Sequence, residues 1–327
     1  MGKRRIRNLF AHGMRAVQIT GVDPRADRRA EARKKYGVQS YSTFAQALKK
    51  VTPDVLIIST PPDRHTPYLL YAARKGKHFF VEHPTTDKGY AQLKRLKNKK
   101  QVGIPSCSFR FHPAMQLMKK IIEQGTIGRV LSFQYHMGQY LPDWHPWEDY
   151  RDVYFSKKAT GACREMFAFE LGWLSFVLPL RVQEISGFTG KLSGLKMTAD
   201  DTYAAVLKCK NNILGTMVID VVSRNPFRTL RVLCSDGVLE WEWQDNILKI
   251  FSAKTKKTQT IKLKRGNQLK QYINTEDMYE AEIGAFLRAI NGGKPFPFSF
   301  AENHRYLKAL FALERSAQTK RYQKLRN

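Results

Sequence analysis

Polar residues follow three apolar runs in the first third of the chain, where parallel strands would end. Asp23 follows one run, Thr60-Pro61-Pro62 with His65 follows the second, and Glu82-His83-Pro84 follows the third. Ligands of doubly wound sheets bind at the carboxyl ends of the strands. The three clusters therefore predict a ligand site that combines the carboxyl groups of Asp23 and Glu82 with two histidines.

Asp23 bears on the choice between NAD and NADP as the cofactor. An acid at the end of the second strand hydrogen-bonds the ribose 2′-hydroxyl of NAD, so Asp23 favours NAD. Arg25 and Arg28 stand close enough in the sequence to meet the 2′-phosphate of NADP instead. The structural alternative is that Asp23 and Pro24 only start the next helix, as its N-cap and first residue.

Three further basic residues are candidate cofactor contacts. Lys3 and Arg4 lie at the start of the first predicted helix, where backbone N–H groups attract anions. Their alternative is a solvated basic helix face. Arg110 falls near the expected domain junction, where a structural role suits it equally well.

A segment dense in aromatic and charged groups runs from Asp143 to Arg151 and reads as a loop, a common position for functional residues. Aromatic faces suit sugar rings, and an arginine can grip a carboxylate or phosphate with two hydrogen bonds. The predicted substrate contacts are Trp144, Trp147, Asp149, Tyr150 and Arg151, with His145 as a candidate proton carrier. The alternative is a packed loop whose tryptophans belong to the core.

The pattern of elements divides the chain near residue 107. Before it, helices (3–12, 25–36 and 65–74) alternate with strands (17–22, 54–60 and 78–82), which predicts a doubly wound parallel sheet. After it come longer strands with hairpin turns (129–140, 182–190, 202–208, 213–222, 228–234, 238–243 and 247–251) and closing helices (278–290 and 302–318). We predict an α/β protein with a dinucleotide-binding domain at 1–107. A substrate and oligomerisation domain at 108–327 would have a large open, mainly antiparallel sheet, and its last helix would pack back on the first domain.

Composition limits the classes of function. The 327 residues include 56 Lys and Arg against 28 Asp and Glu, a formal net charge of +28. The basic residues are dispersed, as in Lys34-Lys35 and Lys256-Lys257, without a long basic tail, so nucleic-acid binding is the less favoured interpretation. No apolar run reaches the length of about 18 residues that a membrane span needs. The basic start lacks the apolar stretch of a secretory signal. We therefore expect a cytoplasmic protein.

The cysteines predict neither a metal site nor a disulfide framework. They are widely spaced, with no C-x-x-C pair and no matching histidine pattern. We expect buried, reduced thiols and no bound metal; the four residues are Cys107, Cys163, Cys209 and Cys234.

Seven short motifs, in order along the chain, resemble the Gfo/Idh/MocA oxidoreductases. They are GKRRIRNL (2–9), VDP (22–24), STPPDRH (59–65), GKHFFVEHP (76–84), FRFHP (109–113), GTIGRV (125–130) and GKPFPFS (293–299). The resemblance implies NAD(P)-dependent chemistry on a sugar or nucleotide sugar, and a homo-oligomer formed through the open sheet. Residues 141–151 and 161–174 resemble a subgroup from surface-polysaccharide loci.

The resemblance also reveals a missing strand. The family begins with a strand and a G-x-G-x-x-G turn. Of this turn only the third glycine has a counterpart here, which is Gly2 in the start Met1-Gly2-Lys3-Arg4 and a candidate cofactor contact. Three explanations stand: an internal methionine of a longer gene, which we favour, a true truncation without cofactor binding, or another element in place of the strand.

The family's Glu-Lys-Pro turn, whose lysine lies near the nicotinamide, reads Glu82-His83-Pro84 here. A histidine can exchange a proton near neutral pH, so His83 is a candidate catalytic residue beside His145. The alternative is a turn histidine without chemistry. Glu82 is a predicted cofactor contact in the same turn.

The family's second motif, Asp-x-x-His-Glu, has also changed. Met166 falls on its aspartate and Phe169 on its histidine, and neither side chain transfers protons. Glu165 shares a helix face with Phe169 and is a candidate substitute acid or base. Arg164 is either a substrate contact or part of a buried ion pair or a capping group, and Glu170 is expected to be a surface or structural residue.

Three functions follow in order of preference. The first is an NAD(P)-dependent sugar oxidoreductase. The second is an inactive binding or scaffold protein that keeps the fold, consistent with the changed motifs. The third is a basic nucleic-acid binder, whose affinity would fall steeply with salt.

Overall fold

A computed structural model describes residues 1–96, 98 and 100–325. The first region alternates helices and strands as predicted: α1 (Gly2–Ala11), β1 (Thr20–Val22), α2 (Ala26–Tyr36), β2 (Gln39–Tyr41), α3 (Phe44–Leu48), β3 (Val55–Ile58), α4 (Thr66–Arg74), β4 (His78–Val81), α5 (Tyr90–Leu96) and β5 (Gly103–Pro105). Gly37 ends α2 at φ 66°, a left-handed conformation that favours glycine. The predicted strand 17–22 is shorter than expected, because Ala16–Gln18 forms a 3₁₀ turn.

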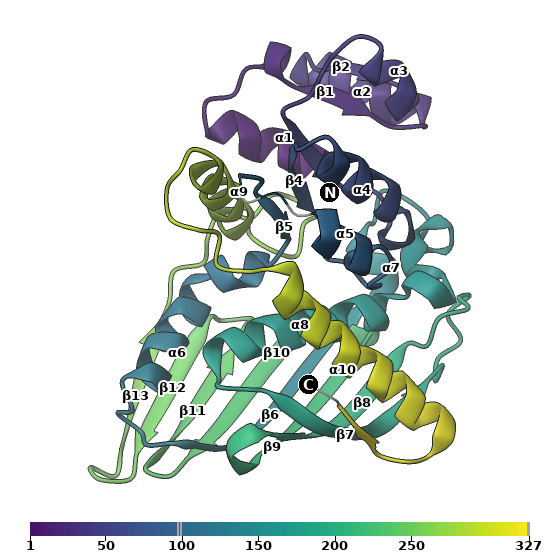
Figure 1. Cartoon of the computed structure of the whole chain (residues 1–327). Coiled ribbons are helices and arrows are strands. Elements are labelled where there is room, and N and C mark those ends of the chain that lie inside the picture. Colours follow the sequence, from purple (N-terminus) through teal and green to yellow (C-terminus); the bar gives the residue numbers. More distant parts are fainter. Residues whose placement is uncertain (97, 99, 326–327) are drawn as a thin grey trace.

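The parallel strands of this region form two separate sheets. β1 pairs with β2, and β3, β4 and β5 pair in that order, all in parallel. No pairing joins β1 to β3 within the described residues, which is where the resemblance would place the family's first strand. In Figure 1, β1, β2, α2 and α3 form a lobe at the top of the molecule. The Rossmann-like prediction is confirmed, with this division of the sheet.

The second region is built on one large mixed sheet. Its elements are α6 (Pro113–Glu123), β6 (Val130–Tyr140), α7 (Leu141–Trp144), α8 (Ala162–Val177), β7 (Val182–Gly190), β8 (Thr202–Cys209), β9 (Ile213–Asp220), β10 (Val222–Cys234), β11 (Gly237–Glu242), β12 (Ile247–Ser252), β13 (Lys257–Lys262), α9 (Asp277–Ile290), α10 (Phe300–Thr319) and β14 (Gln323–Lys324). The strand order is β13-β12-β11-β10-β6-β9-β8-β7-β14. The pairing is antiparallel except between β6 and β9, which run parallel. The strands β13 and β14 were not predicted.

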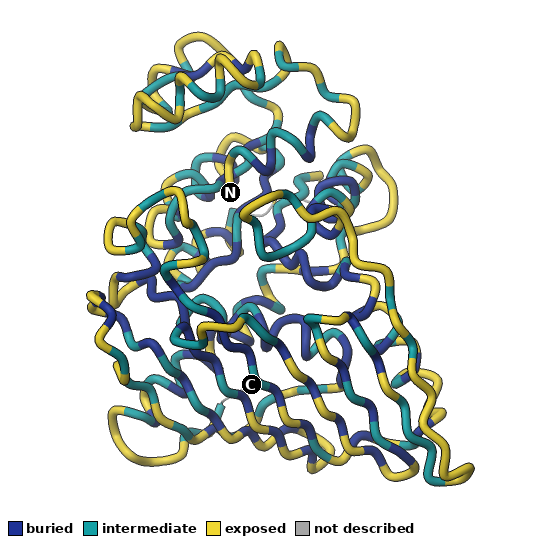
Figure 2. Tube along the Cα trace, turned by 180° about the vertical axis from the view of Figure 1, so that it is seen from behind, coloured by how far each residue is buried: buried dark blue, intermediate teal, exposed yellow. Residues whose placement is uncertain are grey.

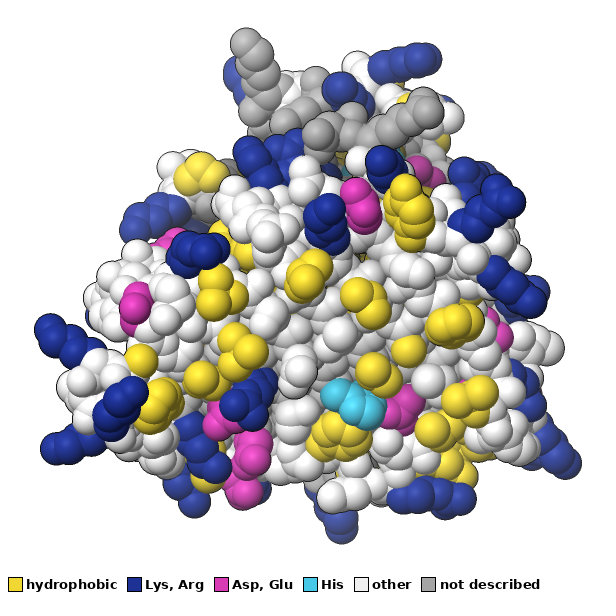
Figure 3. Space-filling view, turned by 90° about the horizontal axis from the view of Figure 1, so that it is seen from below, with side chains coloured by type: hydrophobic (Ala, Val, Ile, Leu, Met, Phe, Trp, Pro, Cys, Tyr) yellow, Lys and Arg dark blue, Asp and Glu magenta, His cyan; other side chains and the backbone are white. Residues whose placement is uncertain are grey.

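Alternation along the strands creates a buried face and an open face. In β8, Tyr203, Ala205, Leu207 and Cys209 are buried while the residues between them are not. The tube in Figure 2 shows this alternation along the strands of the large sheet. On the open face, Val206 is 55% exposed and Leu214 is 52% exposed. Seen from below, the side of the large sheet, hydrophobic side chains are scattered over the surface and Lys and Arg project around its rim (Figure 3).

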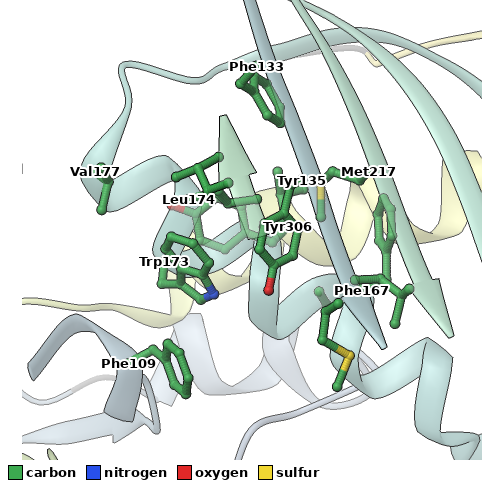
Figure 4. Packing of buried hydrophobic residues seen from close by; sticks show 14 of the residues in the cluster. Phe109, Phe133, Tyr135, Phe167, Trp173, Leu174, Val177, Met217 and Tyr306 are labelled. Carbon is green, nitrogen blue, oxygen red and sulfur yellow. The ribbon is translucent and has the colours of Figure 1, made fainter. Parts of the chain in front are cut away.

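The main core lies between the sheet and the helices α6, α8 and α10. Figure 4 shows Trp173 and Leu174 of α8 among Tyr135 of β6 and Tyr306 of α10. All four side chains are less than 9% exposed, and such burial of large apolar groups is the main stabilising contribution to folding. All four cysteines are buried and unpaired, as predicted.

The two regions are joined by apolar packing. Ile283 and Phe286 of α9 form a cluster with Leu9, Phe80 and Ile104 of the first region. The last helix, α10, contributes Phe300, whose ring lies 5.8 Å from that of Phe79, and the prediction that this helix packs back on the first domain stays a prediction. The domain limits 1–107 and 108–327 stay a prediction. No described helix combines the length and hydrophobicity required to cross a membrane.

Candidate active site at the strand ends

Two predicted clusters meet because β3 and β4 are neighbouring parallel strands. Ile58 is in register with Val81, so Thr60 and His83 follow at the same edge of the sheet. His65 returns to this edge by a hydrogen bond of 2.8 Å between its Nε2 and the Thr60 carbonyl oxygen. This is the ligand edge expected of a parallel sheet.

The edge holds several buried polar atoms without a hydrogen-bonding partner. They are Thr60 Oγ1, His65 Nδ1, both ring nitrogens of His83, and Thr85 Oγ1. The backbone of Ser106 lies beside His83 without reaching either nitrogen in hydrogen-bonding geometry. A buried polar group without a partner costs about 1–3 kcal/mol, so a group of them at a strand edge fits a polar ligand.

His83 is held as a neutral imidazole. Burial lowers its pKa to about 4, because the charged form would lose its hydration. Its ring packs edge-on against Phe169 of α8, with the ring centroids 5.5 Å apart. A neutral imidazole can accept a proton from a substrate hydroxyl at pH 7.

The Glu82 carboxylate is hydrogen-bonded within the protein, and its predicted contact with the cofactor stays a prediction. Arg5 donates to it at 2.7 and 2.9 Å, and Ser59 at 3.2 Å. Burial alone would raise the pKa of Glu82, but the Arg5 guanidinium outweighs burial and lowers it. Arg5 also lies 3.0 Å from Glu282, so this network fixes the turn that carries His83.

Glu165 comes to the same site from the first turn of α8. Its carboxyl group is buried and hydrogen-bonds the Tyr154 hydroxyl, while Oε2 has no partner. Burial, aided by the nearby charge of Glu82 and opposed by the Tyr154 hydrogen bond, raises the pKa of Glu165 to about 8. A carboxyl with such a pKa can donate or accept a proton near neutral pH.

Tyr154 was missed in the sequence. Its side chain is partly buried, and desolvation of the hydroxyl together with the Glu165 carboxylate raises the pKa of this hydroxyl well above the usual range. It belongs to a short 3₁₀ turn, Tyr154–Ser156, within an aromatic segment. Nothing in that segment distinguished Tyr154 from its neighbours, since its role depends on a partner on α8.

The predicted substrate segment splits into a packed part and an open part. Trp144 packs against Phe155 with ring centroids 4.8 Å apart. His145 stacks on Trp147 at 5.1 Å, and burial lowers the pKa of His145 to about 4.

The open part forms a groove of about 980 Å³. Its predicted members are Trp147, Asp149, Tyr150 and Arg151, and Ser193 to Lys196 and Arg224 add to the lining. Asp149 and Arg151 bind each other. His83 and Glu165 do not line this groove, so the structure separates it from the buried cluster at the strand ends.

The end of β1 carries the predicted cofactor acid. Asp23 Oδ1 accepts a hydrogen bond of 2.9 Å from the backbone N–H of Arg25, so Asp23 turns the chain toward α2, although the N-cap itself is Arg25. Asp23 Oδ2 lies 3.9 Å from the Arg28 guanidinium. The contact of Asp23 and Arg28 with the cofactor stays a prediction.

Three predicted basic contacts form ion pairs within the protein, and their contacts with cofactor or substrate stay predictions. Lys3 binds Glu31 at 2.9 Å, and Arg4 binds Glu276 at 2.7 Å. Arg164 binds Glu314 at 2.7 Å, so the ion-pair alternative holds for it. Each guanidinium or ammonium is attracted by a carboxylate that is distant in the sequence.

Arg110 is a structural residue of the second region. It donates to the carbonyl oxygens of Pro297 at 2.8 Å and Gly172 at 3.1 Å, and to the Tyr306 hydroxyl at 3.2 Å. Its side chain is buried among these partners from α8 and α10, and its predicted cofactor contact stays a prediction. Gly2 begins α1, and its predicted cofactor contact stays a prediction.

The residues at the strand ends fit the nicotinamide cofactor that the fold implies. The unpartnered atoms of Thr60, His65 and His83 provide donors and acceptors at one piece of the parallel sheet, and Asp23 ends the other piece. Thr60, His65 and Asp23 would hold the cofactor, with Asp23 at the ribose, and His83 stays a candidate catalytic residue.

Two family models match the chain. Residues 1–102 match the oxidoreductase family with an NAD-binding Rossmann fold, and residues 115–240 match the GFO/IDH/MocA C-terminal domain. Together they account for most of the sequence, in the order expected.

Sequence relatives agree with these models. Levoglucosan dehydrogenase of Pseudarthrobacter phenanthrenivorans is 36% identical over 119 residues, which span 35% of this chain and 30% of that protein. Myo-inositol 2-dehydrogenase of Thermotoga maritima is 23% identical over 99% of this chain and 97% of that protein.

Solved structures share the fold. A levoglucosan dehydrogenase in complex with NADH and levoglucosan superposes with a TM-score of 0.80 at 19% identity, covering 94% of this chain and 90% of that one. A probable dehydrogenase from Thermotoga maritima gives 0.77 at 19% identity, covering 99% and 96%. At these identities the likeness extends to the fold alone.

Proposed function

Since the chain belongs to the GFO/IDH/MocA oxidoreductase family and its first region is of the NAD-binding Rossmann type, we propose that it oxidises a sugar or polyol hydroxyl, or reduces the corresponding carbonyl. The observation that carries the proposal is that His83 packs against Phe169 of α8, while the Glu165–Tyr154 pair lies within electrostatic range of Glu82, the neighbour of His83. Relatives named for levoglucosan and myo-inositol support this substrate class.

The bound cofactor supplies the hydride acceptor or donor. In the oxidative direction, a His83 ring nitrogen, neutral at pH 7, takes the proton of the substrate hydroxyl. In the reductive direction, the same His83 nitrogen returns that proton to the carbonyl oxygen, and the protonated Glu165 carboxyl is a second proton donor at the site. Tyr154 orients Glu165, and Phe169 keeps water from one side of His83.

We extend the proposal to a nucleotide sugar of surface-polysaccharide metabolism as the finer substrate. The groove beside His145 supports it, because Trp147 and Tyr150 offer aromatic faces to sugar rings. Arg151 and Arg224 in the same groove offer cations to phosphate groups. His145 at the inner end of this segment would meet the sugar.

The test begins with titration of the purified protein with NADH, followed by absorbance at 340 nm with a panel of polyols, sugars and nucleotide sugars. We expect NADH binding and turnover of at least one sugar or polyol. His83→Ala and Glu165→Gln should each lower kcat by roughly 10²–10⁴-fold and leave the NADH Kd within about threefold. Glu184→Gln, which removes a surface carboxylate on β7, is the control.

A binding or scaffold role is the second candidate. The division of the parallel strands into two sheets favours it, because the cofactor edge is then not continuous. A folded protein that binds NADH without turnover of any member of the panel would support this candidate. If the protein did not bind NADH, the proposed cofactor would be wrong for the oxidoreductase and for the binding role alike.

We also propose that two copies associate through the open face of the large sheet. This face exposes apolar side chains, including Val206 and Leu214 on neighbouring strands, and a second copy of the same sheet would cover them. Val206→Asp should convert the species seen by sedimentation from dimer to monomer. A wild-type monomer at micromolar concentration would contradict the proposal.

A further inference from the structure

Glu148 connects the predicted substrate segment, Asp143 to Arg151, to the lobe formed by β1, β2, α2 and α3, called the cofactor lobe below. Its Oε2 accepts a hydrogen bond of 3.0 Å from Arg28 and one of 3.5 Å from Arg25, across more than a hundred residues of sequence. Its Oε1 lies 3.4 Å from Nδ1 of His145. The Glu148 side chain is 21% exposed, so the contact is partly shielded from water.

These contacts occupy the two arginines nearest to Asp23. Arg25 is also bound by Asp27 at 2.6 Å, and Arg28 lies 3.9 Å from Asp23. Three carboxylates thus face two guanidinium groups at the end of β1. If Glu148 were absent, the nearest carboxylate to the Arg28 guanidinium among the described residues would be that of Asp23, at 3.9 Å.

An arginine pair at this place has a definite affinity for anions. A guanidinium binds a phosphate through two parallel hydrogen bonds, and a phosphate monoester carries close to two negative charges at pH 7. A phosphate on the ribose 2′-oxygen would have to displace Glu148 and would meet the remaining carboxylates. The 2′-hydroxyl of NAD needs only an acceptor, which Asp23 provides.

We infer that Glu148 is a specificity-determining residue, which selects NAD over NADP by occupying Arg25 and Arg28. The inference rests on the proposed function, because it presumes that the ribose of the cofactor lies at Asp23. Glu148 comes from the segment that carries His145, so the same contact also fastens the substrate segment over the cofactor lobe.

The experiment compares NADH and NADPH binding, by protein-to-nicotinamide fluorescence transfer, in the wild type and in Glu148→Gln. The substitution keeps the shape of the side chain and removes its charge. We expect the ratio of the NADPH Kd to the NADH Kd to fall roughly tenfold, the effect of one charge-assisted hydrogen bond. Glu184→Gln removes an equal charge from β7, where Glu184 pairs with Lys208, and should leave the ratio unchanged.

A second variant tests whether the change in the ratio of the two Kd values depends on Arg28. Adding Arg28→Ala to Glu148→Gln should restore the wild-type ratio, because the phosphate partner is then lost. Displacement by adenosine 2′,5′-bisphosphate should follow the same order, which gives a readout independent of turnover.

Each outcome decides a different question. Wild-type protein that prefers NADH, with an unchanged ratio in folded Glu148→Gln, would overturn the role of Glu148 alone. A wild type that binds NADPH as tightly as NADH would overturn it as well. A wild type that binds neither dinucleotide would overturn the proposed function and this inference together.

Discussion

At the scale of single residues, Glu165 combines burial with chemistry. Among the residues that the structure describes, no cationic side chain is paired with its carboxyl group, and the group is hydrogen-bonded to Tyr154. Burial therefore disfavours the carboxylate, and the pKa of Glu165 rises to about 8. The same feature that makes Glu165 a proton donor at neutral pH should be visible in the stability of the protein.

The sign of this effect follows from proton binding. Between pH 4.5 and pH 8 the folded protein keeps a proton on Glu165 that the unfolded chain releases, so this group lowers stability as the pH rises through that window. Glu165→Gln should remove this loss, and its unfolding midpoint in urea should approach or exceed that of the wild type at pH 8. Parallel midpoint curves for the two proteins would contradict the raised pKa.

The second prediction at this scale concerns Glu170 and Arg228. Glu170 is fully buried, so it is not a surface residue, and it accepts a hydrogen bond of 3.1 Å from Arg228 and one of 2.6 Å from Tyr135. Arg228→Ala would leave the Glu170 charge without its cation.

We expect Arg228→Ala to lower the free energy of unfolding by about 3–5 kcal/mol. Replacing both partners, as Glu170→Leu with Arg228→Met, should recover a large part of that loss, because no buried charge then remains. Denaturant unfolding followed by circular dichroism measures both. A double variant no more stable than Arg228→Ala would show that the ion pair is not the cause.

At the scale of elements, the lobe of residues 20–50 contrasts with the large sheet. Only Val38, Ser40 and Ala47 of this lobe are buried, and the lobe is mainly yellow and teal in Figure 2. Its links to the rest include Phe44, packed on Tyr68 and Tyr71, and the Glu148 contact. β1 and β2 pair with each other and with no other described strand.

This arrangement predicts uneven local stability. Backbone amides of β1 and β2 should exchange with deuterium roughly 100-fold faster or more than those of β6 and β9 in the centre of the large sheet. Hydrogen exchange followed by mass spectrometry tests it. Saturating NADH should slow exchange in the lobe if the cofactor holds the two pieces together, and equal protection of lobe and sheet in the free protein would contradict the prediction.

At the scale of the whole molecule, buried histidines set the response to acid. Burial lowers the pKa to about 4 for each of four residues, which lie in both regions: His65, His83, His112 and His145. The unfolded chain takes up protons on these groups near pH 6.5, whereas the folded protein resists protonation until about pH 4. Stability is therefore lost as the pH falls through this window.

We expect the urea midpoint to decrease from pH 6.5 to pH 4, with a smaller slope in His83→Gln, which removes one of the four groups. The formal charge of +28 adds repulsion that grows in the same direction. Glu165 affects the pH dependence of the urea midpoint in the opposite direction. Both proteins are therefore measured with Glu165→Gln added, so that only the effect of the histidines remains. A midpoint that is flat over this range would contradict the lowered pKa values.

Local patterns in the sequence determined the elements and the order of the two regions. Apolar periodicity placed most strands and helices, and the polar clusters after the strands predicted where His65 and His83 would meet. These features depend on neighbours in the chain, and a parallel sheet brings consecutive strand ends to one edge.

Only the tertiary structure decided which charged groups pair. Arg4 finds Glu276, Arg164 finds Glu314 and Glu148 finds Arg28, all over more than a hundred positions. The parallel contact of β6 with β9 and the division of the first region into two sheets are likewise long-range. No local pattern specifies the partner of a charge or of a strand edge. It is chosen by the packing of the whole chain, and that packing separates the structural arginines from the residues of the site.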